Sequence, residues 1–284
     1  MSVVLVQSLV FEGTDRFELV RMLGEGGMGV VYEAVDREKG HRVALKTVRT
    51  LTGDAVLRLK NEFRALQDLQ HDNLVRLGEL FEHGGTWFFT MELVSGCNFA
   101  EYVRPGSLAH GPISDATWVH TESFAQTIPP PASKRPHGQL DEGRLRASLV
   151  QLVDGLMALH EAGKVHRDVK PSNVLVTSEG RVVLLDLGLV KDVEPAANEQ
   201  MSQEVVGTAT YMAPEQAGSR RVGPEADWYS VGVILYEMLT GSPPFAGTLY
   251  EIISLKQRIE PLAPARLVLT TPPDLDALCT DLLR

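Results

Sequence analysis

The stretch HRDVKPSN at residues 166–173 is the most informative part of the sequence, because it gathers a carboxylate, an ammonium group and a carboxamide within six positions. Asp168 can accept a proton from a hydroxyl group, and Lys170 can neutralise charge on a phosphoryl group in transfer. The side-chain oxygen of Asn173 is a hard ligand that suits Mg²⁺. Taken alone, the stretch is equally typical of a polar turn before a short strand, so its interpretation depends on the motifs around it.

A glycine-rich motif lies upstream, where residues 24–31 read GEGGMGVV and Gly24, Gly26 and Gly29 follow the pattern G-x-G-x-x-G. Glycines at this spacing let backbone N–H groups approach phosphate oxygens without a Cβ in the way. A dinucleotide-binding turn shows the same pattern but continues into a helix. Here the glycines lead into a β-rich run at residues 30–35, which favours a hairpin that covers a nucleotide.

Three further charged residues occupy distinctive positions. Lys46 ends the apolar strand VALK, and Asp186 begins the sequence DLG directly after the apolar strand VVLL. Glu62 lies on a helix expected over residues 54–69, where apolar residues recur at helical spacing. Each of the three is also compatible with an ordinary solvated charge when it is taken alone.

Another run, GTATYMAPE at residues 207–215, ends in A-P-E and is followed by DWYSVG at residues 227–232. The order and spacing of these motifs, over roughly residues 17–260, resemble those of the protein kinase family. In that family, the pattern H-R-D-x-K-P-x-N, which residues 166–173 match, is the catalytic loop. Lys170 resembles the serine/threonine class, and the sequence around the glycines resembles its bacterial members. Leu187 replaces the usual phenylalanine of D-F-G, which is a departure at the packing residue only.

The resemblance implies an α+β, two-lobed fold. Residues 17–94 would form a small lobe with a five-stranded antiparallel sheet and one helix, after an irregular lead-in at residues 1–16. Residues 95–284 would form a larger, mainly helical lobe. Within it, residues 105–138 are proline-rich and aperiodic and form an insertion, for which both disorder and docking onto the lobe stay open. The large lobe is expected to be incomplete at its C-terminal end, with further domains after residue 284.

Hydrophobic periodicity and turn residues give approximate bounds for the individual elements. Strands are expected at residues 17–23, 30–36, 42–49, 74–81 and 87–93, and helices at residues 99–104, 141–162, 225–240, 248–258 and 274–284.

The resemblance also implies a role for particular residues. Lys46 would bind the α- and β-phosphates of ATP and pair with Glu62, while Asp168 and Lys170 would act at the transferred group and Asn173 and Asp186 would hold Mg²⁺. The remaining nucleotide-binding positions would be Leu23, Gly24, Gly26, Gly29, Val31, Ala44, the gatekeeper Met91, the backbones of Glu92 and Val94, and Leu175.

Composition limits the partners and the location. A formal net charge of −10 argues against nucleic acid or an anionic membrane as the main partner, since both require a basic face. The two cysteines form no metal-ligand spacing and no disulfide framework, which fits a reducing cytosol. No run approaches the length of a membrane helix, and the start lacks the features of a signal peptide. We therefore expect a cytoplasmic chain with no nucleic acid partner and no membrane segment, and the resemblance implies a protein substrate.

The implied function is ATP- and Mg²⁺-dependent phosphorylation of serine and threonine on proteins, with autophosphorylation, in bacterial signalling. Two alternatives are a pseudokinase scaffold that binds nucleotide without turnover, and a small-molecule phosphotransferase, which would normally lack the A-P-E segment. Ser202 is the candidate for a phosphorylated residue that meets Arg167, and Glu199 or Glu204 could instead supply a permanent negative charge there.

Overall fold

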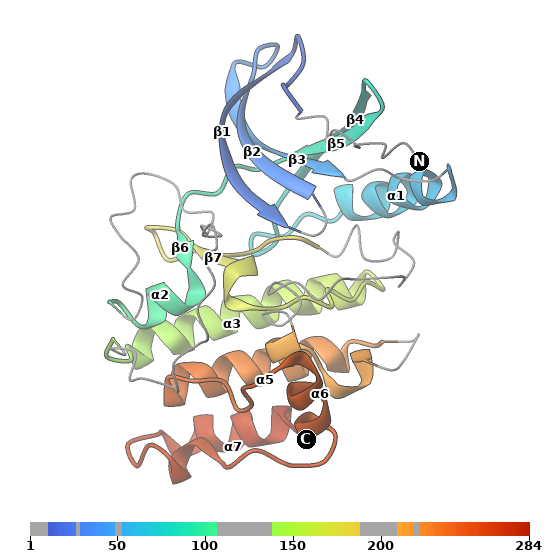
Figure 1. Cartoon of the computed structure of the whole chain (residues 1–284). Helices are drawn as coiled ribbons and strands as arrows, with labels where there is room; N and C mark the ends of the chain where they lie inside the picture. The colour runs from blue at the N-terminus through green and yellow to red at the C-terminus, as the bar shows by residue number, and fades with distance from the viewer. Residues whose placement is uncertain (1–10, 27–28, 49–52, 107–137, 188–208, 218–221) are drawn as a thin grey trace, which may run out of the picture.

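The chain forms two lobes that lie one above the other in Figure 1. The computed structural model describes residues 11–26, 29–48, 53–106, 138–187, 209–217 and 222–284. The upper lobe holds a five-stranded sheet and one helix, whereas the lower lobe is mainly helical with a small three-stranded sheet. The α+β, two-lobed architecture expected from the sequence is confirmed.

The small-lobe sheet is antiparallel, with strand order β1-β2-β3-β5-β4. Its elements are β1 (Phe17–Gly26), β2 (Gly29–Asp36), β3 (His41–Val48), α1 (Gly53–Gln67), β4 (Leu77–His83) and β5 (Thr86–Met91). β1 runs further than expected, because Gly26 pairs with Gly29 at the tip of the β1–β2 hairpin. The glycine motif is therefore a hairpin tip rather than the start of a helix.

Side chains alternate across this sheet, as the two-residue period of a strand requires. On one face Leu45 and Phe88 are buried with Phe17, and the rings of Phe17 and Phe88 meet edge to face at 5.8 Å. On the other face Phe89 lies 5.7 Å from the ring of Phe63 on α1. The helix thus covers the face that also carries the residues around Lys46.

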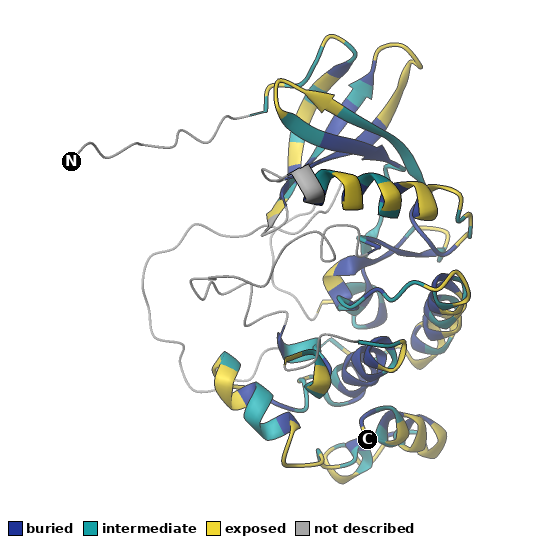
Figure 2. Ribbon diagram, turned by 90° about the vertical axis from the view of Figure 1, so that its right-hand side faces the viewer, coloured by how far each residue is buried: buried dark blue, intermediate teal, exposed yellow. Residues whose placement is uncertain are grey.

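The large lobe contains the following elements: β6 (Cys97–Asn98), α2 (Phe99–Val103), α3 (Glu142–Glu161), η1 (Pro171–Asn173), β7 (Val174–Val176), β8 (Val182–Leu184), η2 (Pro214–Ala217), α5 (Glu225–Thr240), α6 (Leu249–Lys256), η3 (Pro264–Arg266) and α7 (Pro273–Leu282). The bounds expected for α5 are matched, and those of the other elements differ by a few residues at either end. Figure 2 shows buried residues where the helices face one another and exposed residues along their outer surfaces.

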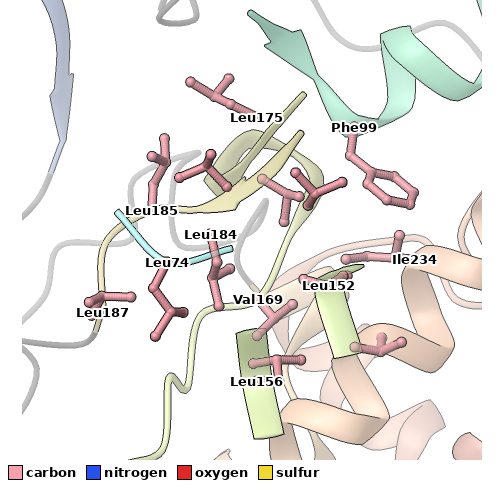
Figure 3. Packing of buried hydrophobic residues seen from close by; sticks show 14 of the residues in the cluster. Leu74, Phe99, Leu152, Leu156, Val169, Leu175, Leu184, Leu185, Leu187 and Ile234 are labelled. Atoms are coloured by element: carbon pink, nitrogen blue, oxygen red, sulfur yellow. The ribbon is translucent and has the colours of Figure 1, made fainter. Parts of the chain in front are cut away.

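Helix α5 is the centre of the large lobe. It is apolar on nearly all sides and buried along most of its length, which is typical of a helix enclosed by others. It ends at Gly241, whose φ of 85° is the left-handed conformation that closes many helices. In Figure 3, Ile234 of α5 and Leu152 of α3 converge near Val169, so the two helices support the loop that carries Asp168.

Backbone hydrogen bonds join the segment after α1 to the large lobe. The N–H of Val75 donates to Leu184 at 3.0 Å, and the N–H of Leu184 donates to Asn73 at 2.9 Å. Leu74 packs beside Leu184 and Leu185 in the shared core, and Leu187 is buried in the same cluster (Figure 3). Leucine thus fills the position where phenylalanine is usual, and it stays packed.

The two ends of the insertion lie side by side. The guanidinium of Arg104 donates to the carbonyl of Gly138 at 3.0 Å, and the N–H of Asp141 donates to Val103 at 2.9 Å. A Cβ at Gly138 would lie 2.1 Å from the carbonyl oxygen of Pro105, so the backbone segments at the two ends of the insertion are in contact. Residues 107–137, on which disorder and docking were left open, lie outside the described residues.

Candidate active site

The loop at residues 166–173, hereafter the HRD loop, is held in place by a buried carboxylate. Asp227 of α5 accepts the N–H of His166 at 2.8 Å and the N–H of Arg167 at 2.7 Å. Arg167 has a φ of 63°, a left-handed conformation that costs a non-glycine residue about 1–2 kcal/mol. The hydrogen bonds to Asp227 stabilise this conformation, which sets the position of the next residue, Asp168.

His166 is a second support of the same loop. Its Nδ1 accepts the N–H of Asp168 at 3.2 Å, so the ring proton lies on Nε2, which donates to the carbonyl of Leu185 at 2.7 Å. The side chain is fully buried. It therefore links the HRD loop to the strand end that leads to Asp186.

The polar residues of the HRD loop converge on Asp168. The ammonium group of Lys170 lies 3.1 Å from Oδ2 of Asp168. Nδ2 of Asn173 donates to the same oxygen at 3.0 Å and to the Asp168 carbonyl at 2.8 Å. Because the amide nitrogen of Asn173 donates to Asp168, the amide oxygen lies on the opposite side of the carboxamide group.

Asp186 lies beside the HRD loop and forms an ion pair with Lys46. Its φ of 54° is again left-handed, and the adjoining N–H of Leu185 donates to the carbonyl of Asn173 at 2.8 Å. Lys46 is 5% exposed, which makes a paired partner necessary for its charge. Strand β3, the HRD loop and the segment after β8 thus bring Lys46, Asn173 and Asp186 to one place.

The expected pair between Lys46 and Glu62 is wrong for this conformation. The carboxylate of Glu62 instead accepts a hydrogen bond from Lys164 at 2.5 Å, and Lys46 contacts Asp186. Both side chains of the Glu62–Lys164 pair are about one quarter exposed, at 27% and 25%. Lys164 lies two residues before the HRD loop, so this ion pair joins α1 directly to the large lobe.

The backbone geometry explains why the third glycine of the G-x-G-x-x-G motif, Gly29, must be a glycine. Gly29 has a φ of 142°, and a Cβ there would stand 1.9 Å from the carbonyl oxygen of Thr47. The hydroxyl of Thr47 also accepts the N–H of Val30 at 3.0 Å. Only glycine permits this close approach of β2 to β3, which positions the hairpin above Lys46.

The apolar residues expected around a nucleotide base come from both lobes and share one cluster. Leu23, Val31, Ala44, Met91, Val94 and Leu175 are all buried there. Met91 pairs with Ala44 in the sheet, which sets it at the inner end of β5. Next to it, the side chain of Glu92 accepts two hydrogen bonds from Arg181, at 2.6 and 3.2 Å. This bidentate pair connects the segment that joins the two lobes, after β5, to the turn between β7 and β8.

The oxygen groups present are suited to magnesium and to few other metals. A carboxylate on Asp186 and an amide oxygen on Asn173 are hard ligands, and Mg²⁺ is usually held by one or two carboxylates together with substrate phosphates. No group of three His, Cys, Asp or Glu side chains able to hold a metal occurs in the part of the chain that the structure describes. A dedicated protein cage is thus not found there, whereas the pair of oxygen donors fits a magnesium nucleotide.

Several residues around the site carry no local sequence signal that identifies them. Lys164 pairs with Glu62, 102 positions away, and Arg181 pairs with Glu92, 89 positions away. Asp227 accepts N–H groups 61 and 60 positions away. An acidic residue in the first turn of a predicted helix and a lysine just before the loop are ordinary by themselves. Only the DWYSVG motif, which contains Asp227, could have marked one of them.

Comparison with known proteins agrees with the fold. The family described as protein kinase domain matches residues 17–284, and the chain belongs to the protein kinase family. Among its curated relatives, the chain is 35% identical over 250 residues to the serine/threonine-protein kinase pkn2 of Myxococcus xanthus, an alignment that covers 85% of this chain and 26% of that protein. It is 34% identical over 270 residues to the serine/threonine-protein kinase PknA of Mycobacterium tuberculosis, with 92% and 54% covered.

A third relative is the probable serine/threonine-protein kinase PknB of Bifidobacterium longum, 32% identical over 236 residues, with 82% of this chain and 31% of that protein covered. The resemblance to bacterial serine/threonine kinases is therefore confirmed. The chain spans about half or less of the length of these relatives. Within the described residues, no helix has both the length and the apolar character needed to cross a membrane.

Proposed function

We propose that this chain transfers the γ-phosphoryl group of ATP to serine and threonine hydroxyl groups of proteins, in bacterial signalling. The observation that carries the proposal is the convergence of Lys46, Asp168, Lys170, Asn173 and Asp186 from three separate segments. The names of the relatives support the class of acceptor.

Each group has a distinct task in the proposed reaction. Asp168 orients the acceptor hydroxyl and accepts its proton as the bond from that oxygen to the γ-phosphorus forms and the bond to the β–γ bridging oxygen breaks. Lys170, 3.1 Å from Asp168, neutralises charge on the transferred group. Lys46 holds the α- and β-phosphates, which explains a nearly buried ammonium group at a strand end.

The remaining residues position the nucleotide. Asn173 and Asp186 would hold Mg²⁺, which when bound neutralises the phosphate oxygens. The backbone groups of Gly24, Gly26 and Gly29 would cover the phosphates. The base would lie among Leu23, Val31, Ala44, Met91 and Leu175, with its polar edge against the backbones of Glu92 and Val94. Most of the acceleration would come from positioning and electrostatic stabilisation.

In this proposal the side of Asp168 that receives the acceptor is bordered by residues 209–217. Gln216 donates to the carbonyl of Arg167 at 3.0 Å and accepts the N–H of Ala213 at 2.8 Å, so this segment is tied to the HRD loop. It includes the A-P-E motif, whose presence disfavours a small-molecule phosphotransferase. The pseudokinase alternative is disfavoured because no polar group of the reaction is missing.

Radiolabelled ATP, Mg²⁺ and myelin basic protein as a generic basic acceptor provide the test, with phosphoamino acid analysis of the product. We expect labelled phosphoserine and phosphothreonine. Nucleotide binding without labelled product would support the pseudokinase scaffold instead, and label on a small molecule would support the other alternative. Ser202, Glu199 and Glu204 lie outside the described residues, so the regulatory role of Ser202 and the cytoplasmic location stay predictions.

A further inference from the structure

A buried lysine at the end of α6 has no part in the phosphate chemistry described above. Lys256 is 8% exposed, and its ammonium group donates to the carbonyl oxygens of Ala209, Thr210 and Met212 at 2.9, 2.7 and 2.7 Å. It also lies 5.3 Å from the centre of the Tyr229 ring. No carboxylate pairs with it among the residues that the structure describes, so all three of its protons go to backbone carbonyls.

The three carbonyls belong to a single short segment. The one carbonyl between them, that of Tyr211, accepts the hydroxyl of Ser230 at 2.8 Å. Residues 209–211 are helical, and the four successive carbonyl groups at residues 209–212 accept hydrogen bonds from side chains of α5 and α6. Three of these carbonyls thus have one ammonium group as their shared donor, and hydrogen bonds from a charged donor are stronger than those from a neutral one.

This segment leads directly to the HRD loop. It is followed by Ala213, whose N–H meets Gln216, and Gln216 in turn donates to the carbonyl of Arg167, the residue before Asp168. The path from Lys256 to Asp168 contains no nucleotide-binding residue. A change at Lys256 therefore acts on the acceptor side of Asp168 and leaves the nucleotide side intact.

We propose that Lys256 is a positioning residue for the protein acceptor, whose ammonium group shapes residues 209–213 and so determines how tightly the acceptor binds. The inference rests on the proposed function and deepens it. The cation acts through the segment that it gathers and does not touch the transferred group. Its loss raises the KM for the acceptor and leaves the KM for ATP unchanged.

Burial lowers the pKa of Lys256 to about 7, which makes the same idea testable without a substitution. An ammonium group has three donors and a neutral amine has two, so deprotonation leaves one carbonyl without its donor. The titratable group that faces Lys256 is Tyr229, which is itself influenced by Glu215. Tyr211, whose neighbours in the chain supply two of the carbonyls, donates its hydroxyl to Glu237. Burial raises the pKa of Tyr229, so this ring stays protonated while Lys256 titrates.

The experiment measures KM for myelin basic protein and for ATP, together with the melting temperature, in four proteins: wild type, Lys256→Met, Lys256→Arg and Arg258→Met. Arg258 is exposed just after the same helix and serves as the matched control. We expect Lys256→Met to raise the acceptor KM by roughly 10-fold or more with the ATP KM unchanged, because small displacements of bound reactants are costly. Lys256→Arg retains the charge and should recover part of the loss, and Arg258→Met should match wild type.

A folded Lys256→Met protein with an unchanged acceptor KM, or with equal changes in both KM values, would overturn the inference. If Lys256→Met does not fold, the wild-type pH profile decides: the acceptor KM should rise from about pH 7 to about pH 9. A flat profile would overturn it. A wild-type protein without any transfer would instead refute the proposed function, which keeps the two failures distinct.

Discussion

The isosteric substitution Asp227→Asn should weaken the hydrogen bonds that hold the HRD loop in place. Asp227 is fully buried and accepts the N–H groups of His166 and Arg167 and the Nε2–H of His160, the last at 2.8 Å. Asparagine keeps the shape of the side chain but removes the charge and replaces one acceptor oxygen by a donor. One buried N–H group then faces another donor.

The magnitude follows from these contacts. A hydrogen bond to a charged group contributes about 1.5–3 kcal/mol, and the variant loses one such bond and weakens the others. We expect the free energy of unfolding to fall by roughly 3 kcal/mol. For a chain of this size that lowers the melting temperature by roughly 6 °C. Arg167 is also released from its left-handed conformation, so Asp168 shifts and kcat falls roughly 10- to 100-fold.

Thermal denaturation and steady-state kinetics measure both effects. Asp154→Asn is the matched control, because Asp154 is an exposed carboxylate on α3 and the chemical change is the same. The control should melt and turn over like wild type. An Asp227→Asn protein with the stability and kcat of the control would refute the idea that this carboxylate positions Asp168.

Two other predictions concern α1 and the insertion. Lys164→Met should free Glu62 to pair with Lys46 and raise kcat by up to about 5-fold, since a partly exposed ion pair is worth no more than about 1 kcal/mol; a lower kcat would mean that the Glu62–Lys164 pair supports the active conformation. Replacing residues 107–137 by a short Gly/Ser linker should leave melting temperature and kcat unchanged, because Pro105 and Gly138 are already in contact. Loss of folding would show that the insertion contributes to the core.

Local patterns in the sequence predicted much of the fold. The bounds of α5 could be predicted because an apolar run ends at a glycine. The β1–β2 hairpin could be predicted because β-branched residues follow the glycine motif. Asp168, Asn173 and Asp186 come from motifs short enough to recognise directly. These features depend on neighbours in the chain, so the sequence contains their full explanation.

The partners of charged groups could not be predicted in the same way. The position of Glu62 on a helix does not specify which lysine it meets, and a partly exposed ion pair contributes only about 1 kcal/mol or less. Tertiary packing therefore decides that Glu62 pairs with Lys164 rather than Lys46. Lys256 looks like an ordinary basic residue in the last turn of a helix. Its contacts with three carbonyls 44 to 47 positions away arise only when α6 packs against η2 and α5.

In the proposed reaction Asp168 acts on the acceptor hydroxyl and does not hold the nucleotide. The most direct test is the rate of phosphoryl transfer to myelin basic protein by Asp168→Asn, measured together with its affinity for ATP and Mg²⁺. Asparagine can still accept the hydrogen bond from Asn173, so the loop should keep its structure. We predict a transfer rate reduced roughly 10²- to 10⁴-fold with nucleotide affinity unchanged. A rate close to wild type, or an equal loss of nucleotide affinity, would show that Asp168 does not have this role.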